Sequence, residues 1–253
     1  IDPAKPYAAF RQASWEEALD FAAAGLKKII ARDGNNALAG FGSAKGSNEE
    51  AYLFQKLVRT GFGTNNVDHC TRLCHASSVV ALLEGLGSGA VSNPVSDVQY
   101  AEVVIVIGAN PIVNHPVAAT LIKNAIQRGT QLILMDPRRT ELARHATHYL
   151  PFKPDTDVAM LNAMLHVIIN EGLADEDFIA RRTEDYAAFK ANIQAYTPEA
   201  MAPICGIPAA TLRQVARLYA SARTAMILWG MGVSQHVHGT DNARCLIALA
   251  LVC

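Results

Sequence analysis

The sequence has 253 residues, a formal net charge of −1 at pH 7 and hydrophobic side chains at 51% of its positions. This composition supports a sizeable buried core and argues against intrinsic disorder. Because Lys and Arg are neither in excess nor clustered, it also argues against a nucleic-acid groove or an anionic membrane surface as partner. No apolar run reaches the length of a transmembrane helix.

Both ends of the sequence predict an internal piece of a longer protein. The first residue is Ile, without Met or a signal-peptide pattern, and residues 245–253 form an apolar segment without a polar tail. Five irregularly spaced cysteines predict no disulfide framework and a reducing, cytoplasmic setting. We interpret Cys205, Cys245 and Cys253, which lie among apolar residues, as inert core cysteines.

The first part of the chain predicts a helix, a short strand and a second helix. Apolar residues recur at helical spacing over residues 15–32, after Ser14 as a candidate N-cap. Residues 37–42 form a short apolar run that enters a Gly/Ser/Asn loop, and residues 49–60 predict the next helix.

The rest of the chain alternates apolar strands with helices. Strands are predicted at residues 103–107, 132–135 and 225–229, and helices at residues 117–128, 157–171, 174–181 and 208–222. This alternation predicts an α/β fold with a doubly wound, mainly parallel sheet that is buried on both faces. Each strand runs into a loop rich in Gly, Pro or Asp, and ligands of such sheets bind beyond the carboxyl ends of the strands.

The densest cluster of reactive side chains is Asp68-His-Cys-Thr-Arg-Leu-Cys-His75. Four zinc ligands are one interpretation, but structural zinc sites take ligand pairs from two separate segments, and no second Cys/His pair follows. A buried helix start with incidental cysteines is the second. The third is a single thiolate on a soft metal, with the adjacent His acting on protons or on the substrate.

Two acidic loops have the chemistry of nucleotide recognition. Asp136-Pro-Arg-Arg-Thr140 follows a strand, where a carboxylate can accept hydrogen bonds from a guanine or ribose and Arg can bind phosphate. Asp155 and Asp157 precede a helix. An ordinary capped helix start explains each loop about as well.

The segment from Gly230 to Gly239 predicts a flexible loop with two histidines, His236 and His238. In a strand-like conformation they would share a face and reach a metal, although no third ligand is near in sequence. Arg244 lies in an apolar helix, where a cation needs a carboxylate partner or an anionic ligand.

Taken in order, these segments resemble the molybdopterin oxidoreductase family that binds two guanine-dinucleotide pterins. Within it, they are most similar to the catalytic (alpha) subunits of formate dehydrogenases, of the cytoplasmic NAD-dependent type with Cys at the metal. The segments are Thr64–Asp68, Cys74-His75, Gly108-Ala-Asn-Pro111, His115-Pro116, Asp136-Pro-Arg-Arg139 and Trp229-Gly-Met-Gly-Val-Ser-Gln235.

The resemblance implies a division of the chain. Residues 1–69 correspond to the first segment of a discontinuous α/β domain, which is thus present only in part. Residues 70–246 correspond to a Rossmann-like α/β domain with the metal-ligand Cys and the pterin-binding loops. Residues 247–253 correspond to the start of the segment that returns to the first domain.

The resemblance also implies a site. Cys74 matches the ligand to molybdenum or tungsten in a bis-molybdopterin guanine dinucleotide cofactor, His75 the histidine beside the metal, and Arg244 the arginine that holds the formate carboxylate. The residues that match cofactor-binding positions are Asn48, Glu49, Gly108, Asn110, Pro111, Asp136, Pro137, Arg138, Asp155, Asp157, Gly232 and Gln235.

The implied reaction is oxidation of formate to carbon dioxide, with electrons passed to flavin/NAD and iron–sulfur subunits. The 4Fe–4S cluster of such enzymes is expected upstream of this sequence, so the piece alone is expected to be inactive. We expect a cytoplasmic protein without nucleic-acid or membrane partners. The alternatives are a nitrate reductase-like enzyme of the family, a metal-free structural subunit of the same fold, and a generic nucleotide-binding α/β module.

Overall fold

The computed structural model describes residues 3–91 and 93–253. The chain divides into two compact units, one ending at Arg72 and the other running from Leu73 to Cys253. The mixed α/β architecture predicted from the sequence is confirmed. No helix among the described residues combines the length and apolar character that a membrane span requires.

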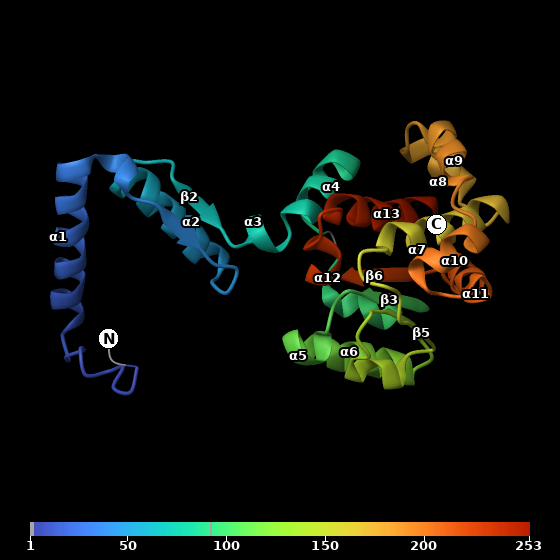
Figure 1. Cartoon of the computed structure of the whole chain (residues 1–253), viewed down its shortest axis with the longest axis horizontal. Coiled ribbons are helices and arrows are strands. Elements are labelled where there is room, and N and C mark those ends of the chain that lie inside the picture. The colour runs from blue at the N-terminus through green and yellow to red at the C-terminus, as the bar shows by residue number, and fades with distance from the viewer. Residues whose placement is uncertain (1–2, 92) are drawn as a thin grey trace. The chain divides into compact units, whose positions relative to one another are not determined.

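The first unit contains a small parallel sheet and two main helices (Figure 1). Helix α1 (Trp15–Asp33) begins where Ser14 Oγ accepts a hydrogen bond from the Glu17 amide. Strands β1 (Gly40–Gly42) and β2 (Val67–His69) pair in parallel. Helix α2 (Asn48–Lys56) starts with a reciprocal capping box and continues into a π-helical turn, η2 (Leu57–Gly61). A short 3-10 turn, η1 (Asn35–Ala37), follows α1.

The second unit contains a four-stranded parallel sheet. Its strands are β3 (Val103–Ile107), β4 (Gln131–Met135), β5 (His148–Leu150) and β6 (Ala225–Trp229), in the order β5-β4-β3-β6. All three pairings are parallel. The sequence predicts β3 and β6 with these bounds and β4 within one residue.

Helices cover both faces of this sheet, which is the doubly wound arrangement predicted. Val103, Ile105 and Ile107 pack in one core cluster with α7 (Asp157–Asn170), α11 (Ala209–Ala220) and α13 (Gly239–Val252). The intervening Val104 and Val106 pack in a second cluster with α6 (Pro116–Gln127). Figure 1 shows α6 on one side of the sheet and α7 and α13 on the other.

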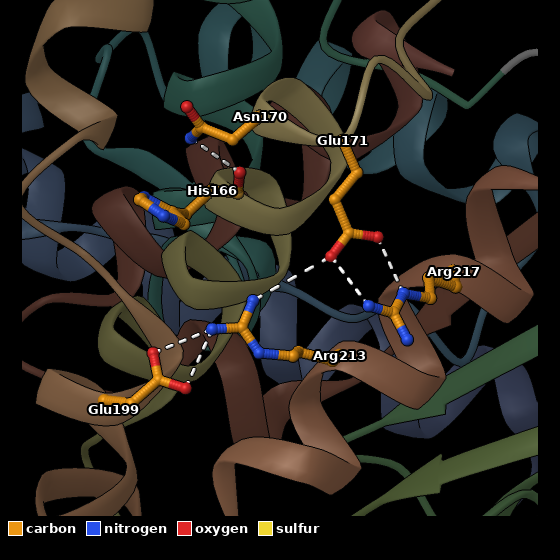
Figure 2. A network of polar contacts seen from close by, with 6 residues as sticks. All are labelled: His166, Asn170, Glu171, Glu199, Arg213 and Arg217. Atoms are coloured by element: carbon orange, nitrogen blue, oxygen red, sulfur yellow. Dashed lines mark hydrogen bonds and ion pairs between the residues drawn. The ribbon is translucent and has the colours of Figure 1, made fainter.

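An ion-pair network ties the outer helices of this unit together (Figure 2). Glu171, just after α7, binds Arg217 of α11 through two hydrogen bonds of 2.6 and 2.9 Å. Arg213, one turn earlier on α11, lies 3.8 Å from Glu171 and binds Glu199 of α10 (Pro198–Cys205). The network therefore fixes the packing of α7, α10 and α11.

The remaining elements are short and connect these layers. They are α3 (Thr71–Cys74), α4 (Ala76–Leu86), η3 (Val95–Tyr100), α5 (Pro111–Asn114), η4 (Glu141–His145), α8 (Glu176–Arg182), α9 (Tyr186–Ile193) and α12 (Met231–Ser234).

One interpretation of the cysteines is wrong. Cys253 is exposed rather than part of the core, because it follows the last turn of α13, whereas Cys205 and Cys245 are buried as predicted. The segment predicted as a loop after Gly230 forms the short helix α12 and then turns, so it lacks the strand-like conformation in which His236 and His238 would share a face.

The predicted division of the chain into a discontinuous first domain and a second domain stays a prediction. The boundary of the two compact units falls between Arg72 and Leu73, near the predicted one. Residues 247–252 continue α13, whose packing partners include α4 and α7 of the second unit.

Candidate functional site at the carboxyl ends of the strands

The strand order identifies where a ligand is expected in the second unit. From β3 the chain builds outward to β4 and β5 in one direction, and it then returns to place β6 on the other side of β3. In open parallel sheets, ligands bind outside the carboxyl ends of the strands at the point where the winding reverses. Here that point lies between the loop after β3 and the loop after β6.

Glycines leave the backbone without side chains at this point. Gly108 follows β3 with φ +56°, and Gly232 lies two residues after Gly230 at the end of β6. A Cβ on Gly108 would lie 2.7 Å from the carbonyl carbon of Gly232, and a Cβ on Gly230 would lie 2.7 Å from the Gly108 carbonyl oxygen. Only glycine fits such an approach. The structure thus brings together Gly108 and Gly232, two of the predicted cofactor-binding residues.

The Cys74-His75 segment is tied to the loop after β6. His75 Nδ1 lies 3.0 Å from Ser234 Oγ, and Ser77 Oγ donates to the Ser234 carbonyl oxygen over 2.7 Å. Gln235 Nε2 donates to the Leu73 carbonyl oxygen over 3.0 Å. Cys74 and His75 are partly buried, and burial lowers the pKa of His75. Three predicted site residues, Cys74, His75 and Gln235, therefore lie together beyond β6.

Buried polar atoms without partners occur on the neighbouring loops. Among the described residues these are Asn110 Oδ1, Thr140 Oγ1 and both carboxyl oxygens of Asp157. Asp157 is only 1% exposed, and burial raises its pKa to about 6. An unsatisfied buried polar group is costly, so its persistence indicates a ligand, ion or water that completes it. The three residues follow β3, β4 and β5 respectively, so they border the same edge of the sheet.

The loop after β4 is a turn with exposed side chains. Asp136 Oδ1 accepts a hydrogen bond from the Arg138 amide over 2.8 Å, and Pro137 and Arg138 are exposed. Burial raises the pKa of Asp136, and the bond from Arg138 opposes this effect. The predicted cofactor residues Asp136, Pro137 and Arg138 thus form one turn at the end of β4.

His236 connects the loop after β6 to the loop before α7. Its Nε2 lies 2.6 Å from the Gly232 carbonyl oxygen, and its Nδ1 lies 3.4 Å from Asp155 Oδ1. Asp155 adopts the left-handed conformation, with φ +64°, which non-glycine residues seldom adopt outside functional or strained loops. Sequence reasoning treated His236 as a possible metal ligand and missed this role, because its partners lie far away in the sequence.

A zinc site is not supported by the part of the chain that the structure describes. No group of three or more His, Cys, Asp or Glu side chains there is arranged to hold a metal ion. The cluster that suggested one also divides between the units, with His69 and Cys70 in the first unit and Cys74 and His75 in the second. The interpretation of Cys74 as a single thiolate ligand of a soft metal stays a prediction.

The predicted role of Arg244 in binding a substrate carboxylate stays a prediction. In the structure Arg244 has carboxylate partners, which is one of the two possibilities that its place in an apolar helix predicts. Its side chain is half exposed, and it binds Asp241 Oδ1 over 3.0 Å and Glu84 of α4. These bonds raise the pKa of Arg244, the bond to Glu84 most. Two carboxylates already balance its charge, so the structure gives no support to the predicted grip on a substrate carboxylate.

Asn48 and Glu49 belong to the first unit. They form the first turn of α2 and, with Tyr52 and Leu53, line an open pocket on its surface. Their predicted contact with the cofactor stays a prediction.

The chain matches a family of known proteins. A family model described as "Molybdopterin oxidoreductase" matches residues 7–253. The chain belongs to the molybdopterin oxidoreductase family. Membership of this family implies a molybdenum- or tungsten-pterin cofactor. The close approach of the glycine-containing loops and the buried polar atoms without partners fit the binding of a large polar group.

The similar proteins include several formate dehydrogenases. Formate dehydrogenase H of Escherichia coli is 42% identical over 240 residues, which are 94% of this chain and 34% of the relative. The alpha subunit of F420-dependent formate dehydrogenase 2 of Methanococcus maripaludis is 42% identical over 243 residues, 96% of this chain and 35% of the relative. A nitrate reductase of Symbiobacterium thermophilum is 40% identical over 243 residues, 90% of this chain and 32% of the relative.

A solved structure shares the fold. Acetylene hydratase from Pelobacter acetylenicus superposes with a TM-score of 0.81 at 28% identity, over 96% of this chain and 33% of that one. The chain therefore spans about a third of the length of the relatives it matches.

Proposed function

We propose that the chain is the part of a formate dehydrogenase catalytic subunit that carries the metal ligand and the main pterin-binding loops. The full-length protein would then oxidise formate to carbon dioxide. The observation that carries the proposal is the attachment of Cys74-His75 to the loop after β6, at the point where the sheet's winding reverses. The similarity to formate dehydrogenases over nearly the whole chain supports it.

Within this proposal the protein side chains have distinct tasks. Cys74 supplies a soft thiolate ligand to molybdenum or tungsten. His75, next to it, acts on the substrate or on the released proton. When bound, the metal–pterin group supplies the two-electron chemistry, and the protein contributes position and charge.

The cofactor-binding residues are proposed to hold a bis-guanine dinucleotide form of the pterin. Buried Asp157 and Asn110 offer oxygen acceptors that suit the N–H groups of a guanine. Asp136 and Arg138 form a turn that offers a carboxylate to a ribose and a guanidinium to phosphate. The remaining members of the proposed set are Asn48, Glu49, Gly108, Pro111, Pro137, Asp155, Gly232 and Gln235.

The electron-transfer arrangement is proposed from the resemblance of the sequence. It comprises iron–sulfur and flavin/NAD subunits, a 4Fe–4S cluster held upstream of residue 1, and a cytoplasmic location. The F420-dependent relative, at the same identity as the Escherichia coli protein, provides the alternative acceptor against which NAD is to be tested.

A nitrate reductase-like activity is the second candidate. One observation favours it: a nitrate reductase is 40% identical. Because both candidates use the same fold and a soft thiolate ligand, only turnover separates them.

The test compares metal and pterin content of the full-length parent protein with its Cys74→Ala and Cys70→Ala variants. Cys70 is the matched control, since it is exposed, its sulfur accepts a hydrogen bond from the Ala44 amide, and it lies 3.9 Å from His69 Nδ1. We expect molybdenum or tungsten and pterin in the parent and in Cys70→Ala, loss of metal in Cys74→Ala, and formate rather than nitrate turnover. A folded parent with neither metal nor pterin contradicts the proposal and favours a structural subunit.

A further inference from the structure

A continuous line of side-chain hydrogen bonds runs from the end of β6 to His75. Trp229 Nε1 donates to Ser78 Oγ over 2.9 Å. Ser78 Oγ lies 2.6 Å from Ser234 Oγ, and Ser234 Oγ lies 3.0 Å from His75 Nδ1. The four residues come from β6, α4, α12 and the residue before α4, so the line crosses the second unit rather than following one helix.

The donor inventory of these side chains sets the direction of every bond. The indole N–H is a donor only, so Ser78 Oγ accepts from Trp229. Among the described residues, the only other side-chain partner of Ser78 Oγ is Ser234 Oγ, so the Ser78 hydroxyl proton points to Ser234. Ser234 Oγ, already accepting that proton, points its own proton to His75 Nδ1. In the reverse direction the Ser78 hydroxyl proton would have no acceptor.

Packing holds the line in place. Ser78 and Ser234 are both only 4% exposed, so water does not compete for their hydroxyl groups. Ser77 Oγ donates to the Ser234 carbonyl oxygen and is not itself a member of the line. A Cβ on Gly239 would lie 2.1 Å from the same carbonyl oxygen, so the first turn of α13 closes directly over it. Buried hydrogen-bond lines of this kind are rigid when every member is satisfied.

We propose that Ser234, to which Ser78 donates, is a positioning residue that holds neutral His75 as the Nε2–H tautomer. Nδ1 is the acceptor of the line, so the ring proton resides on Nε2. No hydrogen bond from residues 3–91 or 93–253 occupies that nitrogen. His75 therefore presents an N–H donor, rather than a lone pair, to an anion bound beside Cys74. The identity of that anion as a small carboxylate, formate, rests on the proposed function.

The ¹⁵N signals of the two ring nitrogens of His75 report its tautomer directly. The 253-residue chain is labelled with ¹⁵N-histidine and measured at pH 8, and the His75→Gln variant assigns the His75 signals by their loss. We expect an unprotonated Nδ1 and a protonated Nε2 in the wild type. In Ser234→Ala the signals of the two nitrogens should move toward each other, because Nδ1 loses its hydrogen-bond donor and both tautomers become populated.

Two further variants distinguish the loss of this line of hydrogen bonds from a general disturbance of the structure. Ser234→Thr keeps the γ-hydroxyl and should restore the wild-type signals. Ser77→Ala removes a neighbouring hydroxyl whose hydrogen bond goes to the Ser234 carbonyl oxygen and not to the line, and it should leave them unchanged. A protonated Nδ1 in the wild type, or an unchanged tautomer in Ser234→Ala, overturns the proposal.

The metal-loaded parent protein gives the second readout. Ser234→Ala should raise KM for formate by a larger factor than it lowers kcat, with recovery in Ser234→Thr, since the tautomer acts on binding of the anion. Equal factors in KM and kcat, or no recovery in Ser234→Thr, contradict the positioning role. A parent that turns over no formate while His75 stays in the Nε2–H form contradicts the proposed function and leaves the tautomer assignment standing.

Discussion

Gly108 and Gly232 meet backbone to backbone: the Gly232 amide donates to the Gly108 carbonyl oxygen over 2.9 Å, with no side chain between them. This contact joins the loop after β3 to the loop after β6, two strands that are neighbours in the sheet but lie more than a hundred residues apart in sequence. The same loops carry Asn110 and Gln235, so the contact sets the distance between two sides of the proposed cofactor site.

The first prediction concerns this contact. Gly108→Ala should lower the free energy of unfolding by about 3 kcal/mol, since it adds left-handed backbone strain to a clash that only backbone movement can relieve. Gly172→Ala is the matched control: Gly172 has a similar positive φ of +69°, but a Cβ there meets nothing within 4 Å. It should cost only about 1 kcal/mol. Denaturant unfolding measures both, and equal losses would contradict the role of the close approach.

The sheet of the second unit could be predicted from the sequence because its strands have a strong local signal. β3 and β6 are continuous apolar runs bounded by loop residues, as expected for strands buried on both faces. β5 was missed because three residues, His148, Tyr149 and Leu150, show neither an apolar run nor a period. β2 was missed for the same reason.

The sequence predicts which types of residue form the site, but not the contacts between them. The pattern around Cys74-His75 indicated chemistry, but Ser234, the hydrogen-bond partner of His75, lies 159 residues away, and Ser78 and Trp229 carry no motif of their own. The carboxylate partners of Arg244 could not be identified for the complementary reason. An apolar helix still has a side that faces solvent, and Glu84, the carboxylate that meets Arg244 there, comes from α4, 160 residues away in sequence.

The second prediction is that replacing Asp157 by Asn stabilises the protein above pH 6. The folded-state pKa of Asp157 is raised to about 6, so this carboxyl group holds its proton in the folded state where the unfolded chain has lost it. The contribution of Asp157 to stability should therefore fall as pH rises from about 4 to about 6 and stay level above that range. We expect a gain of about 2 kcal/mol for Asp157→Asn at pH 8 and none at pH 4.

The charged groups that face Asp157 define the control. His236 opposes the rise in pKa and Asp155 contributes to it, and the buried Cys245 thiol is close enough to be affected in turn. Asp155→Asn, at a half-exposed position, should reproduce little of the gain. Urea unfolding at pH 4, 6 and 8 measures the three proteins. A gain that is the same at every pH would show that packing, rather than the ionisation of Asp157, is responsible.

The third prediction separates structural from substrate-binding roles for Arg244. If Arg244 serves to pair Glu84 and Asp241, then Arg244→Met in the parent protein should change KM for formate less than threefold and lower the midpoint of unfolding. Glu84→Gln should lower it similarly, and the double variant should lose less than the two single losses combined, with a coupling below about 1 kcal/mol for so exposed a pair. A large rise in KM with unchanged stability would instead return Arg244 to the substrate site.

The last prediction concerns acid stability of the network in Figure 2. The bonds from Arg217 hold the pKa of Glu171 below its usual value, with Arg213 adding to the effect. A carboxyl group whose pKa is lower in the folded state stabilises the fold above the unfolded-state pKa of about 4.5, and this contribution is lost as pH falls through the folded-state value. Glu171→Gln and Arg217→Met should therefore each lower the unfolding midpoint at pH 7 and have less effect near pH 3. Combining them should add little to either change, because both remove the same interaction. Thermal unfolding at pH 7 and pH 3 measures this, and additive losses at pH 7 would show that the two side chains stabilise the helices independently.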